Sequence, residues 1–310
     1  MIKVNQLSKH FGAKKAVDKI SFEVRVGQVM GLLGPNGAGK STTMKMATGC
    51  LRPTAGTVTF DGCDVWKKPL QAKAILGFLP ESAPSYDDLT VTEFLDYLAS
   101  IRGLRGKNKT NAIERSLELC YLDGVRHQSV DTLSKGYRHR ICLAQSILHD
   151  PKVIVFDEPT DGLDPNQKRE IQNLVTEIKK DKAIILSTHI LDEVDTVCTD
   201  LVLLNQGTII REGTPATLRE ESSQRRHLEL EATGDGVEKE LLKIAGVRAV
   251  LENEAPRFLI ETSADSEADR QALAEEVHAL AVTKNWKVRR LAFCQGSLEE
   301  VFRKLTFTDN

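Results

Sequence analysis

The stretch GPNGAGKS at residues 34–41 decides the fold of this chain. It fits the pattern G-x-x-x-x-G-K-[ST], and it lies between the compact apolar run Val29–Leu33 and a segment with helical periodicity. In such a strand–loop–helix setting, glycines allow consecutive backbone N–H groups to point at phosphate oxygens, and the helix adds its positive N-terminal end. We therefore predict a phosphate-binding loop. The nucleotide-binding residues expected here are Gly34, Pro35, Asn36, Gly37, Ala38, Gly39, Lys40, Ser41 and Thr42.

Two side chains of this loop are expected to do chemistry as well as shape it. Lys40 can supply a point charge to the β- and γ-phosphates of a nucleotide, and the Ser41 hydroxyl can ligate Mg²⁺. The alternative is a glycine-rich turn that happens to contain a lysine. Because a phosphate loop alone does not distinguish kinases, GTPases and transport ATPases, the second half of the site has to be found elsewhere in the sequence.

Two adjacent carboxylates follow another buried apolar run, Val153–Phe156. Neighbouring residues of a strand point to opposite faces, so we expect Asp157 and Glu158 to have different roles. Asp157 can hold Mg²⁺, while Glu158 is free to orient the attacking water. The alternative is a structural pair of salt-bridged carboxylates at the end of a strand.

The segment LSKGYR at residues 133–138 precedes a helix with one apolar face. Ser134 suits the N-cap position of that helix. Taken alone, the segment predicts only a well-capped amphipathic helix. Its position is more informative, because Ser134 lies 23 residues before Asp157.

Together these motifs resemble the ATP-binding cassette, or ABC, family of ATPases over about residues 1–220. The likeness rests on GPNGAGKS at 34–41, LSKGY at 133–137, VIVFDEP at 153–159, DGLD at 161–164 and a histidine at 189 that closes the next strand. A narrower likeness is to single-cassette exporter ATPases of gliding-motility, drug, sodium or copper-processing systems. It rests on LPE at 79–81, SKGYRHR at 134–140 and GSLEEVF at 296–302.

The resemblance implies an ATP- and Mg²⁺-dependent hydrolase in which two copies face each other head to tail. Each ATP would lie between the phosphate loop of one copy and the segment Ser134, Lys135 and Gly136 of the other. The resemblance further implies an adenine-stacking role for Phe11, a γ-phosphate-sensing role for His189 and a coupling role across the dimer for Asp164. Glu81 would contact Mg²⁺ or the catalytic water.

The sequence departs from the family pattern in the regions that carry these roles. Glu81 stands where most members have Gln, so its contact to metal or water would carry a full negative charge. Lys135 and Tyr137 replace a Gly and a Gln; Lys135 either adds a charge-assisted contact to phosphate or projects into solvent. Asp161 stands where Ser is common, and no consequence follows from the sequence.

The order of apolar runs predicts an α/β fold. The compact runs have the composition of strands that are buried on both faces of a largely parallel sheet, with helical segments between them. These predicted strands are Val29–Leu33, Ile75–Leu79, Val153–Phe156, Ala183–Ser187 and Leu201–Leu204. Together with the motifs above, the resemblance implies a P-loop NTPase (RecA-like) ABC cassette. Residues 82–150 show consecutive helical patterns and are expected to form an inserted helical lobe.

The sequence pattern of the C-terminal part predicts a small accessory domain. We therefore expect a nucleotide-binding domain at residues 1–220 and an accessory domain at residues 221–310. Its pattern is β-α-β-β-α-β, the order of a ferredoxin-like α+β sandwich, followed by a last helix. The predicted strands are His227–Ala232, Arg248–Leu251, Arg257–Thr262 and Val288–Ala292, and the predicted helices are Val237–Ile244, Glu267–Ala281 and Leu298–Leu305.

Composition limits the partners. The 310 residues carry 42 Lys and Arg against 44 Asp and Glu, a formal charge of −2, so no nucleic-acid partner is expected. No stretch approaches the roughly 18 apolar residues that cross a bilayer. We therefore expect a cytoplasmic protein, peripheral on the membrane through separate permease subunits that dock around Glu81–Leu95.

The six cysteines show no C-x-x-C pair and are expected to be reduced.

The sequence leaves two other functions open. An ABC-type ATPase acting on DNA or ribosomes is disfavoured, because only about 110 residues separate Ser41 from Asp157 and a single phosphate loop is present. Repair members need long coiled coils between the motif halves, and translation members usually carry two cassettes. A small-molecule kinase is disfavoured because it needs neither the 133–137 segment nor His189.

Overall fold

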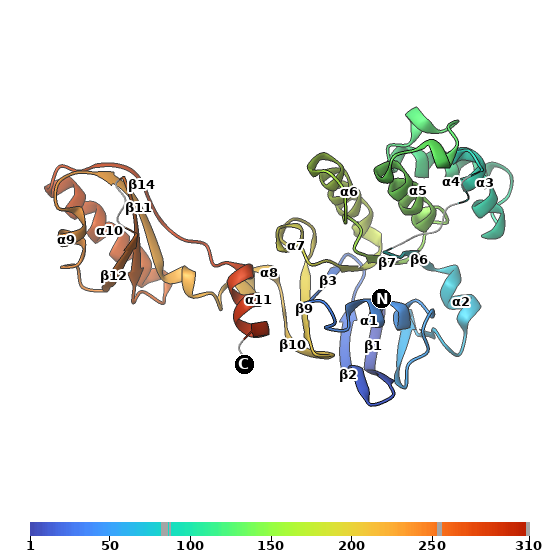
Figure 1. Ribbon diagram of the computed structural model, residues 1–310, viewed down its shortest axis with the longest axis horizontal. Helices are drawn as coiled ribbons and strands as arrows, with labels where there is room; N and C mark the ends of the chain where they lie inside the picture. The colour runs from blue at the N-terminus through green and yellow to red at the C-terminus, as the bar shows by residue number, and fades with distance from the viewer. Residues whose placement is uncertain (82–85, 87, 253–255, 308–310) are drawn as a thin grey trace. The chain divides into compact units, whose positions relative to one another are not determined.

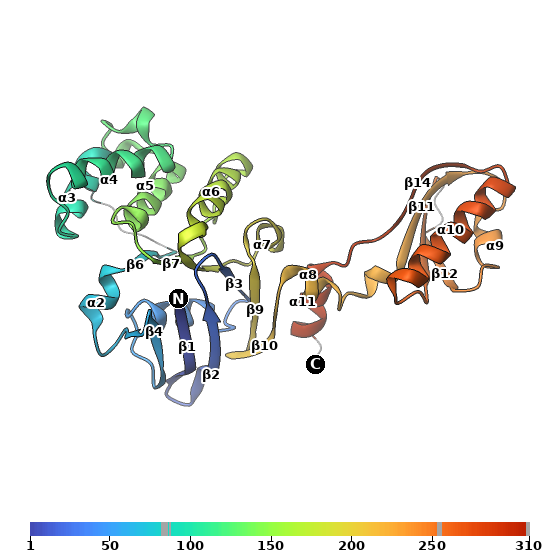
Figure 2. The same cartoon turned by 180° about the vertical axis from the view of Figure 1, so that it is seen from behind.

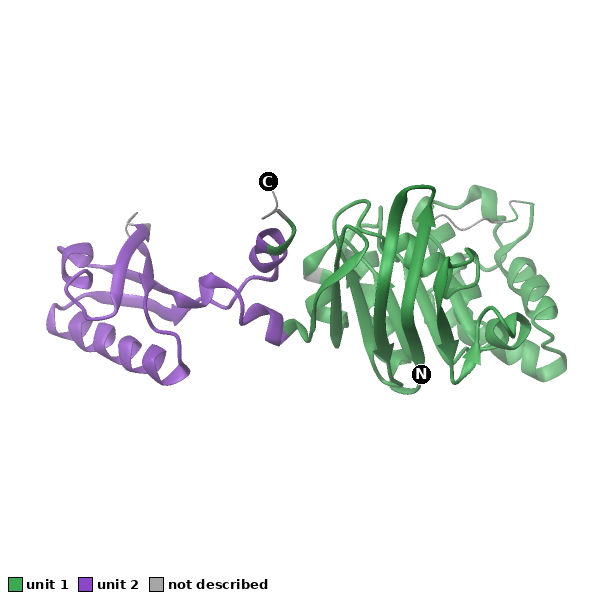
Figure 3. Cartoon of the chain, turned by 90° about the horizontal axis from the view of Figure 1, so that it is seen from below, with its two compact units in different colours: residues 1–215, 305–310 green, residues 216–304 purple. Residues whose placement is uncertain are grey.

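The computed structural model describes residues 1–81, 86, 88–252 and 256–307. The chain divides into two compact units, one formed by residues 1–215 with 305–310 and the other by residues 216–304 (Figure 3). No helix in the described ranges has the length and apolar character needed to cross a bilayer.

The first unit is built on a six-stranded sheet in the order β10-β9-β3-β8-β7-β6 (Figure 1). The strands are β3 Val29–Leu33, β6 Leu76–Leu79, β7 Val153–Asp157, β8 Ala183–Ser187, β9 Asp200–Asn205 and β10 Thr208–Gly213. All neighbours pair in parallel except β10, which pairs with β9 in the antiparallel sense. Strands β3, β7 and β8 are buried along their whole length. The largely parallel, doubly covered α/β sheet predicted from the apolar runs is confirmed.

A second, antiparallel sheet in this unit is absent from the sequence prediction. It has the order β2-β1-β4-β5, with β1 Ile2–Phe11, β2 Lys14–Val24, β4 Ala55–Phe60 and β5 Cys63–Asp64. Its strands bury one face only, so polar and apolar residues are interspersed along them. A search for compact apolar runs therefore passes over them.

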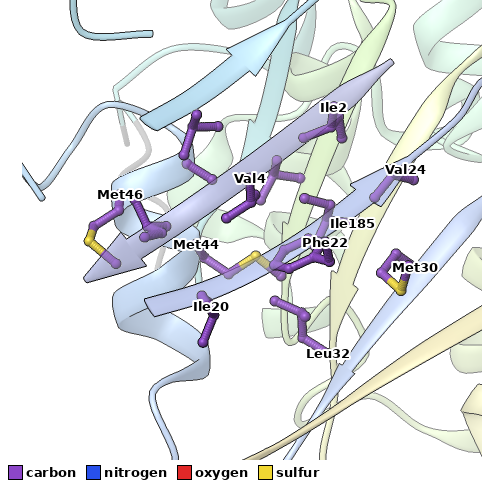
Figure 4. Packing of buried hydrophobic residues seen from close by; sticks show 14 of the residues in the cluster. Ile2, Val4, Ile20, Phe22, Val24, Met30, Leu32, Met44, Met46 and Ile185 are labelled. Carbon is purple, nitrogen blue, oxygen red and sulfur yellow. The ribbon is translucent and has the colours of Figure 1, made fainter. Parts of the chain in front are cut away.

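The main core lies between the two sheets and encloses helix α1 (Lys40–Ala47). Met44 and Met46 of this helix are fully buried against side chains of both sheets, among them Ile2 and Val4 of β1 and Ile185 of β8 (Figure 4). The helix that begins at the phosphate loop is thus held on both sides by apolar packing. This packing fixes where the loop stands.

The remaining helices of the first unit do not share one position, since the first of them contributes Ala72 to the main core and later ones form a group of their own. They are α2 Pro69–Ala74, α3 Val91–Ile101, α4 Gly106–Leu119, α5 Lys135–Ile147, α6 Pro165–Ile178 and α7 Leu191–Val197. Helices α3, α4 and α5 pack on one another and stand together in both views (Figures 1 and 2). They occupy the range of the expected helical lobe, whose first residues, 82–85, lie outside the described ones.

The second unit contains the predicted β-α-β-β-α-β order. Its elements are β11 His227–Thr233, α9 Val237–Leu241, β12 Val247–Glu252, β13 Arg257–Thr262, α10 Glu267–Thr283 and β14 Lys287–Phe293. The sheet is antiparallel throughout, in the order β12-β13-β11-β14. Leu228, Ile260 and Val277 are fully buried in a core separate from that of the first unit. Helix α8 (Pro215–Arg219) precedes these elements and α11 (Leu298–Phe307) follows them.

Candidate active site

The phosphate loop takes a backbone path that needs glycine. Gly37 and Gly39 have φ angles of +84° and +107°, which side-chain-bearing residues rarely adopt. A Cβ on Gly39 would also stand 2.7 Å from the carbonyl oxygen of Ala16. Gly39 is the N-cap of α1, so the loop leads directly into the positive end of a helix that is fixed in the core.

Lys40 lies inside the loop rather than on the surface. Its side chain is almost fully buried, and Nζ donates a hydrogen bond of 2.6 Å to the carbonyl oxygen of Gly34. Burial lowers the pKa of the Lys40 ammonium, while the charges of Glu158, Asp157 and Glu81 raise it. The lysine charge is therefore held at the phosphate loop, within electrostatic reach of three carboxylates, and is available to a phosphate group.

An open cleft of about 340 Å³ joins the loop to three of the predicted side chains that lie outside it, namely Phe11, Glu81 and Glu158. The cleft is lined by Phe11, Lys14, Ala16, Pro35, Asn36, Gly37, Gly39, Lys40, Ser41, Thr42, Glu81 and Glu158. The ring of Phe11, at the end of β1, is 51% exposed, and Lys9 Nζ stands 5.1 Å from its centroid. An aromatic face at the cleft mouth is available for stacking on a base.

The two adjacent carboxylates do diverge, but for a different reason from the one expected. Strand β7 ends at Asp157, so Glu158 is not a strand residue and the alternation argument does not apply. Instead Glu158 has a φ of +51°, a left-handed backbone that costs about 1–3 kcal/mol outside glycine. Asp157 is buried and accepts a 2.6 Å hydrogen bond from Ser187 Oγ, whereas Glu158 lines the cleft.

Ser187 and His189 hold Glu158 in this position. The Glu158 amide donates to Ser187 Oγ at 2.9 Å, and His189 Nδ1 lies 2.9 Å from Glu158 Oε2. The imidazole is about half exposed, while the Glu158 side chain is 15% exposed. The contact between His189 and Glu158 thus joins the ends of β8 and β7 at the cleft. The sequence prediction gave Ser187 no role at this site.

The segment Ser134, Lys135 and Gly136 does not line this cleft. Ser134 caps α5 by accepting from the Tyr137 amide, as predicted. Lys135 lies over Gly162, where a Cβ would collide with its Nζ, and Gly136 packs against Gln167 in the same way. The segment therefore packs on the DGLD turn and the start of α6, and the chain by itself does not bring it to the phosphate loop.

Asp164 has an additional role within its own chain. Its Oδ1 accepts hydrogen bonds from the amides of Asn166 at 3.0 Å and Gln167 at 2.9 Å, so it is the N-cap of α6. The pattern of Asp followed by Pro at the first helical position would have predicted this cap. The dimer-coupling role implied by the resemblance remains a proposal.

Glu193 on α7 is a second residue that the sequence prediction missed. Its side chain is about 5% exposed, and Oε2 accepts hydrogen bonds from Thr160 Oγ1 and Thr188 Oγ1, while Lys168 Nζ lies 3.2 Å from Oε1. Thr160 follows the Glu158 turn and Thr188 precedes His189. One buried carboxylate thus connects the two segments that carry the Glu158–His189 pair. Glu193 is the third residue of the short helix α7, and no local sequence pattern indicates that its side chain connects two other segments.

The oxygen-bearing side chains at the cleft suit Mg²⁺. This ion prefers oxygen ligands and usually takes one or two carboxylates together with substrate phosphates. Ser41 and Glu81 line the cleft, and Asp157 lies close enough to act on the Lys40 charge. Among the residues that the structure describes, no group of three or more His, Cys, Asp or Glu side chains forms a metal site of its own.

Comparison with known proteins gives consistent matches. Residues 17–161 match the model of the family described as "ABC transporter". "Uncharacterized ABC transporter ATP-binding protein YxlF" of Bacillus subtilis is 31% identical over 305 residues, which cover 98% of this chain and 99% of that protein. This chain belongs to the ABC transporter ATP-binding family. As a member, it carries the ATP-binding cassette of that family.

Other relatives match the cassette part of this ABC ATPase. "Probable multidrug ABC transporter ATP-binding protein YbhF" of Escherichia coli is 36% identical over 224 residues, 72% of this chain. This chain spans only 39% of the length of YbhF. "Nod factor export ATP-binding protein I" of Paraburkholderia xenovorans is 35% identical over 218 residues, 70% of this chain and 72% of that protein.

A solved structure described as an "ATP binding subunit of ABC transporter" has a TM-score of 0.66 at 29% identity and covers 71% of this chain and 92% of that one. The P-loop NTPase fold expected from the motifs is therefore confirmed for this ABC ATPase.

Replacing Glu193 by Gln should slow ATP hydrolysis with little change in nucleotide affinity. The amide keeps the shape of the carboxylate but leaves Lys168 without its charged partner, so we expect a loss of about 1–3 kcal/mol in unfolding free energy. Loosening of the Glu158–His189 segments should lower kcat while KM stays within about twofold. Steady-state kinetics and urea denaturation measure both. Glu177→Gln on the exposed face of α6 is the control; equal kcat in the two variants would contradict the positioning role.

Proposed function

We propose that this ABC ATPase works as a homodimer that encloses two Mg-ATP and drives separate membrane-spanning subunits in export. The observation that supports this proposal is that two parts of the expected nucleotide site lie apart from each other within one chain. The phosphate loop, Phe11, Glu81 and Glu158 share a cleft, while Ser134–Gly136 lies on the DGLD turn outside it. A second copy, facing the first head to tail, supplies the missing segment to each cleft.

Each group in the cleft has a chemical task in this proposal. Lys40 and the amides at the start of α1 bind the β- and γ-phosphates. The partner's Ser134 segment presents the positive end of α5 to the γ-phosphate from the other side. Glu158 orients and deprotonates the attacking water, and His189 senses the γ-phosphate while it holds the Glu158 carboxylate. Asp164 couples the two sites across the dimer.

Mg²⁺ would be held by Ser41, Glu81 and Asp157, and when bound it would neutralise charge that develops on the phosphate oxygens. Because Glu81 replaces an uncharged residue, this chain would surround the metal with more negative charge than most of its family. The Lys40 charge, already placed among the same carboxylates, offsets part of that repulsion.

The energy for closing the dimer comes from the nucleotides. Moving an open state from 1:99 to 99:1 needs about 5.5 kcal/mol, and a ligand that binds both states equally shifts nothing. Two enclosed nucleotides supply this at about 3 kcal/mol each, an ordinary yield for charge-assisted contacts. Hydrolysis removes the γ-phosphate contacts across the interface, so the dimer reopens.

The membrane-spanning partner is proposed to dock near the start of the helical lobe, around Glu81–Leu95. Residues 82–85 and 87 lie outside the described ones. Within this range Tyr86 is 55% exposed, and just beyond it Tyr97 and Ile101 of α3 are 46% and 63% exposed. The Tyr86 and Tyr97 rings meet edge to face at 5.6 Å, which forms an aromatic patch suited to a protein partner. This docking would place the protein on the cytoplasmic face of the membrane.

The direction of transport, export, is the most specific element of the proposal. It is supported by the narrower sequence likeness carried by residues 79–81, 134–140 and 296–302, and by a relative that is named for Nod factor export.

Replacing Glu158 by Gln should lower turnover by about 10² to 10⁴-fold while ATP still binds, because the amide cannot accept the proton of the water. With Mg-ATP the variant should accumulate as a closed dimer, measured by light scattering after gel filtration. Glu177→Gln, a substitution of the same type outside the cleft, should turn over normally and stay in exchange with monomer. Ordinary turnover of Glu158→Gln would disprove the base assignment.

A cysteine at Tyr97 should cross-link to the membrane subunits. In membranes that contain the assembled transporter, a bifunctional thiol reagent on Tyr97→Cys, in a Cys50→Ser background, should yield an adduct with a multi-span protein. Thr208→Cys on β10, at the opposite edge of the parallel sheet, is the control and should give none. Adducts from Thr208→Cys alone would place the docking surface elsewhere.

A further inference from the structure

The C-terminal unit has a cleft of its own, with a volume of about 360 Å³. It lies where α8 and the following turn meet the end of β14 and the side of α10. Its lining residues are Ala216, Arg219, Glu220, Arg225, Arg270, Phe293, Cys294, Gln295 and Gly296. None of them belongs to the phosphate loop or to the other ATP-site motifs, so the ATP chemistry leaves this cleft unexplained.

The lining is strongly basic. Arg219, Arg225 and Arg270 contribute three guanidinium groups, and Glu220 is the acidic residue among the described side chains that line the cleft. Glu220 neutralises little, because its Oε1 lies 4.0 Å from Arg225 Nη1 and its side chain is 64% exposed. Arg219 also takes part in an interaction within the chain, so the charges that face a ligand most directly are those of Arg225 and Arg270.

Arg270 gives the clearest indication of a ligand. Its guanidinium carbon stands 5.9 Å from the centroid of the Phe293 ring, which orients the planar group. Its Nε is buried and has no hydrogen-bond partner, and no ion pair of Arg270 is found within the described ranges. A buried donor atom without a hydrogen-bond partner carries a desolvation cost, and contact of the Arg270 guanidinium with an anionic ligand would offset it.

The walls of the cleft are held by close backbone contacts. Gly296 packs so tightly on the carbonyl of Arg219 that a Cβ would collide with it. The Glu300 carboxylate accepts hydrogen bonds from the hydroxyls of Ser222 and Ser223 and from the Gln224 amide at 3.2 Å. The turn that carries Arg225 is therefore fixed by the GSLEEVF stretch, and this stretch also packs on the backbone of Arg219.

We propose that this cleft binds a phosphate group, either of a soluble phosphate compound or of a lipid headgroup. A phosphate monoester carries about −1.5 to −2 charges near pH 7, and the guanidinium groups of Arg225 and Arg270 offer it positive charge from two walls of the cleft. It also offers three acceptor oxygens, and arginine forks bind phosphate oxygens in a bidentate manner. A lone carboxylate would satisfy fewer of the donors and half of the charge.

The test is calorimetric titration of the full chain with inorganic phosphate. All proteins carry Lys40→Ala, which weakens binding at the phosphate loop. Adding Arg270→Gln, or Arg225→Gln on the more exposed wall, should raise Kd at least about tenfold, since hydrogen bonds to charged groups are among the strong ones. Arg257→Gln is the control, because Arg257 is an exposed arginine of the same unit outside the cleft and should leave Kd unchanged.

Two outcomes would overturn the proposal. One is the same phosphate affinity, or none in the millimolar range, whether or not Arg270 and Arg225 are present. The other is tighter binding of succinate than of phosphate, which would make this a carboxylate site. Co-sedimentation with phosphatidylcholine vesicles, with and without phosphatidic acid, distinguishes a lipid headgroup from a soluble phosphate compound as the ligand. Arg270-dependent sedimentation with phosphatidic acid supports a lipid headgroup, and phosphate binding without sedimentation supports a soluble ligand.

Discussion

The parallel alignment of β3, β8 and β7 is the constraint on which the rest of the site depends. Because neighbouring parallel strands end at the same edge of the sheet, the loop after β3 and Glu158 after β7 meet at one cleft, and His189 after β8 contacts Glu158. The sheet is buried on both faces and α1 is packed between two sheets, so these ends cannot shift independently. Lys40 then lies among carboxylates by the geometry of the fold alone.

Much of this could be predicted from the sequence, for identifiable reasons. The buried strands are short and wholly apolar, the phosphate loop needs glycine at fixed positions, and Ser134 precedes a regular amphipathic helix, so local patterns were sufficient. The antiparallel sheet was missed because its strands bury one face only. Glu158 was placed by the wrong argument, since a left-handed φ rather than strand alternation turns its side chain to the cleft. Glu193 could not be predicted, because its partners Thr160, Thr188 and Lys168 are brought together only by the fold.

The two units divide the chemistry between them. The first brings the phosphate loop, Phe11, Glu81 and Glu158 to one cleft, while its own Ser134–Gly136 segment lies outside that cleft. The second has a separate core and a basic cleft whose frame includes Gly296 and Glu300, both from a stretch that otherwise has no role in ATP chemistry. Under the two proposals, hydrolysis depends on a second copy of the first unit, and phosphate recognition by the second unit is independent of it.

The shared site can be tested most directly by mixing two variants that are each inactive for a different reason. Lys40→Ala removes the phosphate ligand of one half-site, and Ser134→Arg blocks the segment proposed to close the other. In a mixed dimer, one of the two sites pairs an intact phosphate loop with an intact Ser134 segment. A site shared between two chains predicts that ATP hydrolysis reappears on mixing. If the mixture stays as inactive as its components under conditions where subunits exchange, each nucleotide is held by one chain alone and the shared site is contradicted.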